Sequence, residues 1–191
     1  MEPSARSARK VELSLNHMEM YRKWLMLMTG AAFHLVGKTL LLFGGDGMFL
    51  PAMISFIIGH VFYLILLIGF LLPLRKADAA ILLAPILLSW ILPIQMKIEM
   101  PMAVGIALVA ALLALYVLAG FLGVLRKKKG FVWVLIGGLC FCAADMVTAR
   151  SNFGGANVPW ADIVSEVLFG AAEILIVVAL FIFIHHNHKQ Q

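Results

Sequence analysis

Apolar residues form long, nearly continuous runs along this chain, separated by short polar segments. A helix needs about 20 predominantly apolar residues to cross a bilayer. The third run is short and contains Pro85 and Pro93, so we expect it to be kinked or re-entrant. The pattern predicts an all-α polytopic membrane protein, a bundle of about six transmembrane helices. The predicted spans are 24–44, 49–73, 79–95, 101–125, 131–148 and 163–184.

Basic residues collect in alternate polar segments, and this distribution predicts the orientation of the bundle. They precede the first span and follow the second, fourth and sixth spans. Because loops rich in lysine and arginine stay in the cytoplasm, we expect both termini to be cytoplasmic. The formal net charge of +5 is therefore a topology signal and does not indicate a nucleic-acid partner. The residues concerned are Arg22, Lys23, Arg75, Lys76, Arg126, Lys127, Lys128, Lys129 and Lys189.

The composition, 63% hydrophobic and 13% charged, predicts one transmembrane domain over residues 21–184. Residues 1–20 form a polar, basic tail that we expect to be disordered or to lie along the inner membrane surface. Residues 185–191 form a second short tail. The C-x-C spacing of Cys140 and Cys142 falls inside a span, where we expect the thiols to pack between helices. No metal or cofactor is predicted, membrane lipids are the expected partners, and the sequence indicates no oligomeric state. The predicted location is an integral, multi-pass position, in the cell (inner) membrane if the source is prokaryotic.

A few ionisable residues lie inside the predicted spans, where charge is expensive and usually functional or paired. Helix rise places Lys38 and Asp145 about 21 Å from the cytoplasmic boundary, and His60 and Glu173 near the midplane at about 15–16 Å. We expect Lys38 to pair with Asp145 or Glu173, and His60 with either carboxylate. Glu166 lies closer to the outer boundary and is expected to reach headgroups or water. Also inside the spans are His34, one turn from Lys38, and the hydroxyls of Tyr63 and Tyr116.

Two interpretations of these residues remain open at this stage. They can be satisfied polar clamps between helices, or they can form a cavity in which burial tunes a group for proton chemistry. A short internal repeat bears on their arrangement. Glycine stands eight residues before the charge in Gly30…Lys38 and again in Gly137…Asp145. Phenylalanine stands four residues before His60 and again before Glu173. A true repeat would place two hairpins face to face around one cavity.

Three segments resemble the YhhN-type membrane proteins, the lysoplasmalogenase family. The stretch FHLVGKTLLLFGGDGMFLPAMISFIIGHVFY resembles the family's paired spans, with Phe56, His60 and Tyr63 matching in type and spacing. The stretch GGLCFCAADMVTARSNFGG resembles its Gly-x-x-x-Phe-x-x-Ser-Asp segment, with Asp145 matching and Ala144 in place of the serine. The stretch GAAEILIV resembles its Ala-Gln-Leu-Ile element. Family members typically have about eight spans, so this chain is expected to be divergent and shorter at its N-terminus.

The resemblance implies hydrolysis of the vinyl ether bond of a lysoplasmalogen or related lysolipid by buried acid and base residues. We assign Asp145 and Glu173 as the acid and the cation stabiliser, His60 as the residue that positions water, and Lys38 as a further catalytic residue. The predicted substrate-binding residues are Tyr63, His34 and Tyr116.

Two departures from the family pattern keep other functions open. Lys38 stands where relatives carry an aspartate, and Glu173 where they carry a glutamine. An ammonium beside Asp145 would make that carboxyl a poor acid. One alternative is therefore a non-catalytic relative in which Lys38 and a carboxylate form a structural ion pair. The other is a small proton-coupled transporter that uses the same buried charges.

Overall fold

The computed structural model describes residues 5–95, 98–153 and 159–188, and these residues form helices without β-strands. Five helices are long and apolar enough to cross a membrane, which confirms the predicted fold class. The elements in chain order are α1 (Ala5–Phe43), the 3-10 turn η1 (Asp46–Met48), α2 (Phe49–Leu71), α3 (Lys76–Leu88), α4 (Ile91–Gln95), α5 (Met102–Leu125), α6 (Phe131–Phe153) and α7 (Ala161–His188).

The third predicted span does not form one continuous helix, unlike the other five. It is broken into α3 and α4 at Ser89 and Trp90, and the 13 residues of α3 rise only about 20 Å. Pro85 lies inside α3 and Pro93 inside α4, and the missing N–H of each proline removes a helix hydrogen bond. The expected kink is therefore a full break of the helix.

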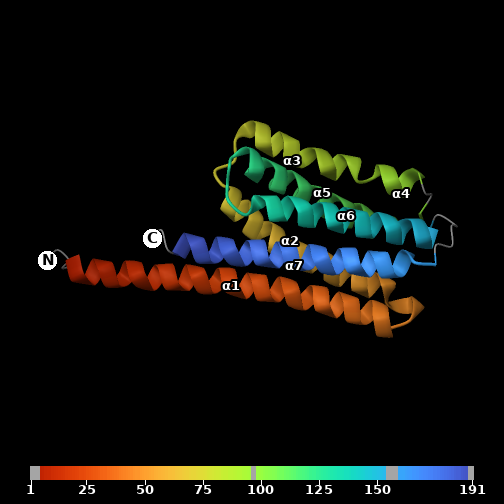
Figure 1. Cartoon of the computed structure of the whole chain (residues 1–191), viewed down its shortest axis with the longest axis horizontal. Coiled ribbons are helices and arrows are strands. Elements are labelled where there is room, and N and C mark those ends of the chain that lie inside the picture. The colour runs from red at the N-terminus through yellow and green to blue at the C-terminus, as the bar shows by residue number, and fades with distance from the viewer. Residues whose placement is uncertain (1–4, 96–97, 154–158, 189–191) are drawn as a thin grey trace.

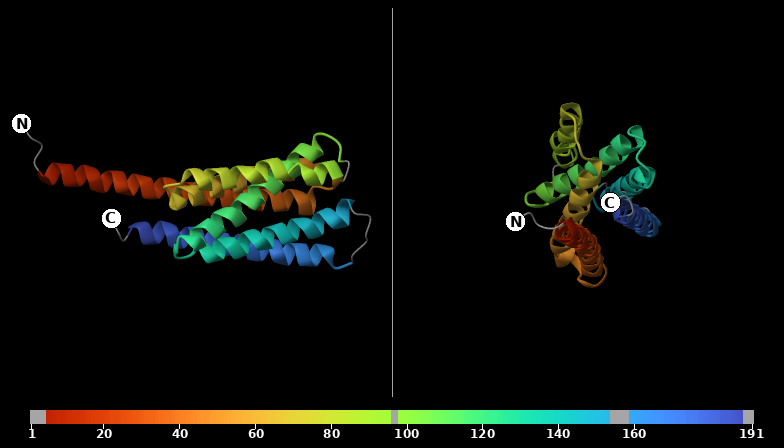
Figure 2. Two further views of the ribbon diagram at one scale, coloured as in Figure 1. Left: turned by 90° about the horizontal axis from the view of Figure 1, so that it is seen from above. Right: turned by 90° about the vertical axis from the view of Figure 1, so that its left-hand side faces the viewer.

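Residues 5–20 also differ from the expectation of a disordered tail, because they are helical and continue directly into the first span. Residues 5–29 contain no glycine or proline, so nothing in the sequence ends the helix there. In Figure 2 the N-terminal part of α1 projects beyond the rest of the bundle. The helix ends before Gly44 and Gly45, and the φ of 66° at Gly45 is a left-handed conformation suited to glycine.

Five helices form a closed ring in the order α1, α2, α5, α6, α7 (Figures 1 and 2). Consecutive members pack extensively, whereas α1 and α7 touch along a much thinner seam that closes the ring. Helices α3 and α4 pack on α5, outside the ring. Polar side chains from α1, α2 and α7 can thus meet inside the ring.

The basic loops gather at one end of the bundle, together with the two described ends of the chain (Figure 1). Arg126 donates hydrogen bonds to the carbonyls of Leu71 (2.7 Å) and Pro73 (3.0 Å) and forms an ion pair with Asp78. These contacts place a cation at the C-terminal end of α2, where it complements the helix dipole. We call this end the basic end. The cytoplasmic location assigned to it remains a prediction.

The internal repeat is visible in matching contacts of the hairpins α1–α2 and α6–α7. A Cβ atom added to Gly30 would lie 2.4 Å from the Tyr63 ring, and one added to Gly137 would lie 2.8 Å from the side chain of Ile176. In both hairpins a backbone carbonyl oxygen from the second helix lies 3.2 Å from the same added atom. The two glycines therefore let equivalent helix pairs approach closely, and the hairpins join through α1 and α7.

Candidate active site

Glu173 lies at the centre of a polar cluster formed by three helices of the ring. Its Oε2 atom lies 2.6 Å from His34 Nδ1 of α1, and its Oε1 atom accepts a hydrogen bond of 2.6 Å from the Tyr63 hydroxyl of α2. His34 and Tyr63 are fully buried. Both carboxylate oxygens therefore contact polar side chains from two other helices, and these two short contacts fix the Glu173 side chain.

Two buried imidazole nitrogens lie beside this carboxylate without a hydrogen-bond partner among the described residues. They are Nε2 of His34 and Nδ1 of His60, and the two rings are 4.4 Å apart between centroids. The Tyr116 hydroxyl donates to the backbone carbonyl of His60 at 3.0 Å and packs against its ring. Since buried polar atoms are almost always satisfied, these two nitrogens are the atoms of the site whose hydrogen-bonding capacity is unused.

Aromatic rings surround the two imidazoles. Phe141 lies 5.1 Å from the His60 ring and 6.1 Å from the His34 ring, between centroids. Phe169 lies 5.0 Å from Phe141, and Phe56 lies 5.4 Å from Phe169. An apolar wall lowers the local dielectric response, so the charge on Glu173 acts more strongly on neighbouring groups than it would in water. We refer to Glu173, His34, Tyr63 and His60 as the inner cluster.

A second group of charges, the outer cluster, lies nearer the ends of the helices opposite the basic end. Lys38 Nζ lies 2.6 Å from Glu166 Oε1 and 4.0 Å from the centre of the Phe169 ring. Asp145 makes no hydrogen bond or ion pair in the described part of the chain, although Lys38 acts electrostatically on its carboxylate. The expected pairing of Lys38 with Asp145 or Glu173 is therefore wrong, since Lys38 pairs with Glu166.

The physical reason for this difference is the length of the lysine side chain. Helix rise gives the height of a Cα atom, whereas an ammonium on a four-carbon stem reaches toward the nearer boundary. Glu166, which the sequence indicated for headgroups or water, lies within this reach and has a side chain 51% exposed. A test of lysine reach against every carboxylate on neighbouring spans could have found it.

The expected pairing of His60 with a carboxylate is also wrong, because no hydrogen bond joins His60 to Glu173 or Asp145 in the described residues. His34 takes that place instead. It lies one turn below Lys38, at the height that the sequence assigned to Glu173. Depth along the membrane normal thus gives the height of the Glu173 contact correctly. The rotation of each helix about its axis decides which imidazole contacts Glu173.

The seam between α1 and α7 leads to the inner cluster. The Glu173 side chain is 21% exposed there, while the Lys38 side chain is 18% exposed one turn farther along the seam. Among the described residues, no group of three or more histidine, cysteine, aspartate or glutamate side chains is placed to hold a metal ion.

Comparison with known proteins identifies one family. No curated protein and no solved structure matches the chain. A model of one family, described as the YhhN family, matches residues 9–180. The match covers four of the apolar helices, most of the fifth, and both polar clusters. This multi-pass membrane protein therefore belongs to the YhhN family.

Proposed function

We propose that this chain is a membrane hydrolase that cleaves the vinyl ether bond of a lysoplasmalogen or a related lysolipid. Family membership supports the reaction class through the resemblance of the chain to lysoplasmalogenases. The observation that carries the proposal is the His34–Glu173 pair, in which one imidazole nitrogen contacts the carboxylate and the other is buried and unpaired. This arrangement suits an imidazole that exchanges protons with a substrate while a carboxylate holds its orientation.

The first step is proton transfer to carbon. His34 in its protonated form, held by Glu173 through Nδ1–H, gives the Nε2 proton to the alkene carbon that bears the alkyl chain. The electron pair of the double bond forms the new C–H bond, and the positive charge moves to the adjacent carbon–oxygen unit as an oxocarbenium ion. The carboxylate of Glu173 stabilises this cation in the apolar site. The proton donor in this mechanism is His34, whereas the sequence indicated Asp145 for that role.

The second step adds water and returns the proton. A water molecule at His34 Nε2 attacks the oxocarbenium carbon, and the now neutral His34 takes a proton from it. The resulting hemiacetal collapses to a fatty aldehyde and a glycerophospho-alcohol, with its hydroxyl proton passing to the leaving oxygen. One water molecule is consumed, and His34 ends the cycle protonated as it began.

Lateral access explains why a lipid substrate fits this chain. The vinyl ether bond of a lysolipid lies close to its headgroup and joins an alkyl chain that prefers the membrane interior. Entry through the seam between α1 and α7 would place this bond against the partly exposed Glu173 carboxylate without drawing the alkyl chain out of lipid. A bundle of membrane helices can in this way act on a membrane-embedded bond.

The test is aldehyde release from a lysoplasmenyl lipid by the purified protein in detergent. We expect the wild type to be active and His34→Gln to lower kcat/KM by about 100-fold or more, since positioned proton transfer contributes about 10²–10⁴. Asp162→Asn is the matched control, because it removes an exposed carboxylate from the same helix as Glu173 outside both clusters. Loss of activity in Asp145→Asn with retention in His34→Gln would restore Asp145 as the acid and refute the role given to His34.

The Lys38–Glu166 ion pair favours a second candidate, a non-catalytic relative in which the outer cluster is structural. In this case the charges hold α1 against α7, and the inner cluster serves as a satisfied clamp. Absence of aldehyde release from wild-type protein, beside an active eight-span family member under the same conditions, would select this candidate.

A further inference from the structure

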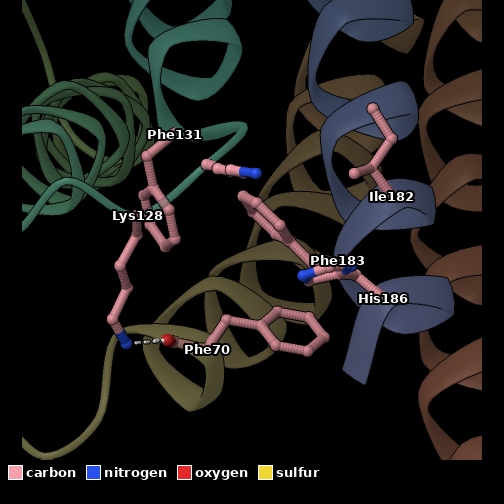
Figure 3. Close-up of a pocket in the computed structure, with 7 residues that line it drawn as sticks. Phe70, Lys128, Phe131, Ile182, Phe183 and His186 are labelled. Carbon is pink, nitrogen blue, oxygen red and sulfur yellow. Dashed lines mark hydrogen bonds between the residues drawn. The ribbon is translucent and has the colours of Figure 1, made fainter. Parts of the chain in front are cut away.

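A pocket opens at the basic end of the bundle, away from both polar clusters (Figure 3). Its volume is about 280 Å³. Its walls come from the end of α2, the α5–α6 loop with the start of α6, and the last turns of α7. The lining residues are Phe70, Lys128, Lys129, Phe131, Ile182, Phe183 and His186. The pocket thus combines basic groups with an aromatic wall.

Positive charge is in excess around this pocket. Arg126, in the same loop, is matched by its ion pair with Asp78. Lys128 and Lys129 form no ion pair with a carboxylate in the described part of the chain. The lining contains no acidic residue. A ligand that balances this charge must be an anion.

Lys128 is held in place by the end of α2. Its ammonium donates a hydrogen bond to the carbonyl of Phe70, drawn in Figure 3, and a second of 3.3 Å to the carbonyl of Leu72. Burial, and then the neighbouring charge of Arg126, lower the pKa of Lys128 from its ordinary value. Because an ammonium has three donors, one remains for a ligand after both carbonyls are bound.

The aromatic wall gives the pocket its fixed shape. Phe183 stacks on Phe131 with 4.7 Å between ring centres and lies 5.3 Å from Phe70. Gly130 has a φ of 87°, and a Cβ atom there would lie 2.6 Å from the Phe183 ring. Only glycine lets the loop that carries Lys128 approach α7 this closely.

We propose that this pocket binds the phosphate group of an anionic ligand, either a lipid headgroup or a soluble phosphate ester. Basic pockets between membrane helices recognise anionic headgroups through lysine charge, while apolar side chains receive the glycerol or the start of an acyl chain. The phenyl rings of the pocket suit that second part.

This site is distinct from the one that would bind a hydrolase substrate. Along α7, His186 lies 13 positions beyond Glu173, which corresponds to about 20 Å. In a lysoplasmalogen about five bonds of roughly 1.5 Å separate the phosphorus from the vinyl ether oxygen, so one molecule cannot place these two groups in both sites. The inference therefore does not depend on the proposed hydrolase activity.

Lipid binding to the purified full chain in a neutral detergent tests the proposal. Native mass spectrometry would follow titration with phosphatidylglycerol and, separately, with zwitterionic phosphatidylcholine. Lys129→Gln removes a pocket cation, and Lys127→Gln is the matched control because it removes the same charge from the same loop outside the pocket. We expect tighter binding of phosphatidylglycerol, an increase in its Kd of about fivefold in Lys129→Gln, and no change in Lys127→Gln.

Competition distinguishes the two sources of phosphate. Glycerol 3-phosphate would identify a soluble ester as a ligand if it displaces phosphatidylglycerol from the wild type but does not displace the lipid that still binds when the pocket lysine is removed. Failure to displace it would identify the lipid headgroup. Equal binding of the two lipids, or equal weakening by Lys127→Gln and Lys129→Gln, would overturn the proposal, since either result would reduce the effect to general surface charge.

Discussion

The close approach of α1 and α2 beside the inner cluster gives a sharp test of the packing described above. Gly59 lies on α2 where the two helix backbones nearly touch. A Cβ atom at this position would lie 2.3 Å from His34 Cδ2, 2.7 Å from His34 Nε2 and 2.9 Å from the carbonyl oxygen of Gly30. Real Cβ atoms do not make such contacts, and the Gly30 carbonyl belongs to backbone that cannot rotate away. Gly59→Ala must therefore move the His34 ring or separate the helices.

The expected loss of stability follows from three terms. Overpacking of a filled site costs about 1–3 kcal/mol. Displacement of His34 weakens its hydrogen bond to Glu173, a bond of a class worth about 1.5–3 kcal/mol. Alanine gains up to about 1 kcal/mol over glycine in a helix interior. With partial relaxation, we expect Gly59→Ala to destabilise the protein by about 2–3 kcal/mol.

Gly69→Ala on the same helix is the matched control, because no atom lies within 4 Å of its added Cβ. It should leave the stability unchanged or raise it by up to about 1 kcal/mol. Thermal unfolding of both variants in the same detergent, followed by circular dichroism of the helices, measures the difference. The two variants should differ by about 2–4 kcal/mol, so at about 2–4 °C per kcal/mol Gly59→Ala should melt roughly 4–16 °C below Gly69→Ala. A Gly59→Ala protein as stable as the control would refute the packing of His34 against α2.

Three further predictions concern other parts of the bundle. Gly137→Ala, at the position that matches Gly30 in the first hairpin, should destabilise the protein by about 1–2 kcal/mol relative to Gly170→Ala, whose added Cβ atom lies within 4 Å of no other atom. Equal melting temperatures of these two variants would count against the repeat. Substitutions Lys38→Met and Glu166→Gln should show a coupling of at least about 0.5 kcal/mol in a double-mutant cycle of thermal stability, and additive effects would show that the ion pair contributes nothing. Lys127 holds a left-handed φ of 55° at the end of α5, so Lys127→Gly should stabilise the protein by about 1 kcal/mol in denaturant unfolding. Lys127→Ala, which keeps the unfavourable Cβ atom, should not stabilise it.

Most of the fold could be predicted from the sequence because a bilayer imposes length and polarity on each span. Five of the six predicted stretches are helices long enough to cross it. The exception, around Pro85 and Pro93, was marked by the residues that break it. The continuous helix through residues 5–20 was missed because charge and polarity were taken to indicate disorder, although no helix breaker lies there.

The candidate site was predicted in its residues but not in its pairs. His34 and Glu173 were both selected, and the internal repeat pointed to the hairpins that carry them. Their pairing depends on the rotation of α1 and α7 about their axes, which helix rise does not specify. The ion pair of Lys38 with Glu166 depends on side-chain reach, which shifts the charge by several ångströms from the height of its Cα atom.

The seam between α1 and α7 joins the first helix of the ring to the last, and this order has a consequence for how the protein is made. Lys38 and His34 enter the membrane early, but their partners lie 128 and 139 residues later in the chain. During synthesis the Lys38 and His34 side chains of α1 therefore lie in lipid without their carboxylate partners until α7 is inserted. A chain that stops before residue 161 would lack the partners Glu166 and Glu173. We therefore expect membrane proteases to degrade it much faster than a full-length chain carrying Lys38→Met. The order of the helices therefore makes the pairing of these two side chains depend on completion of the ring.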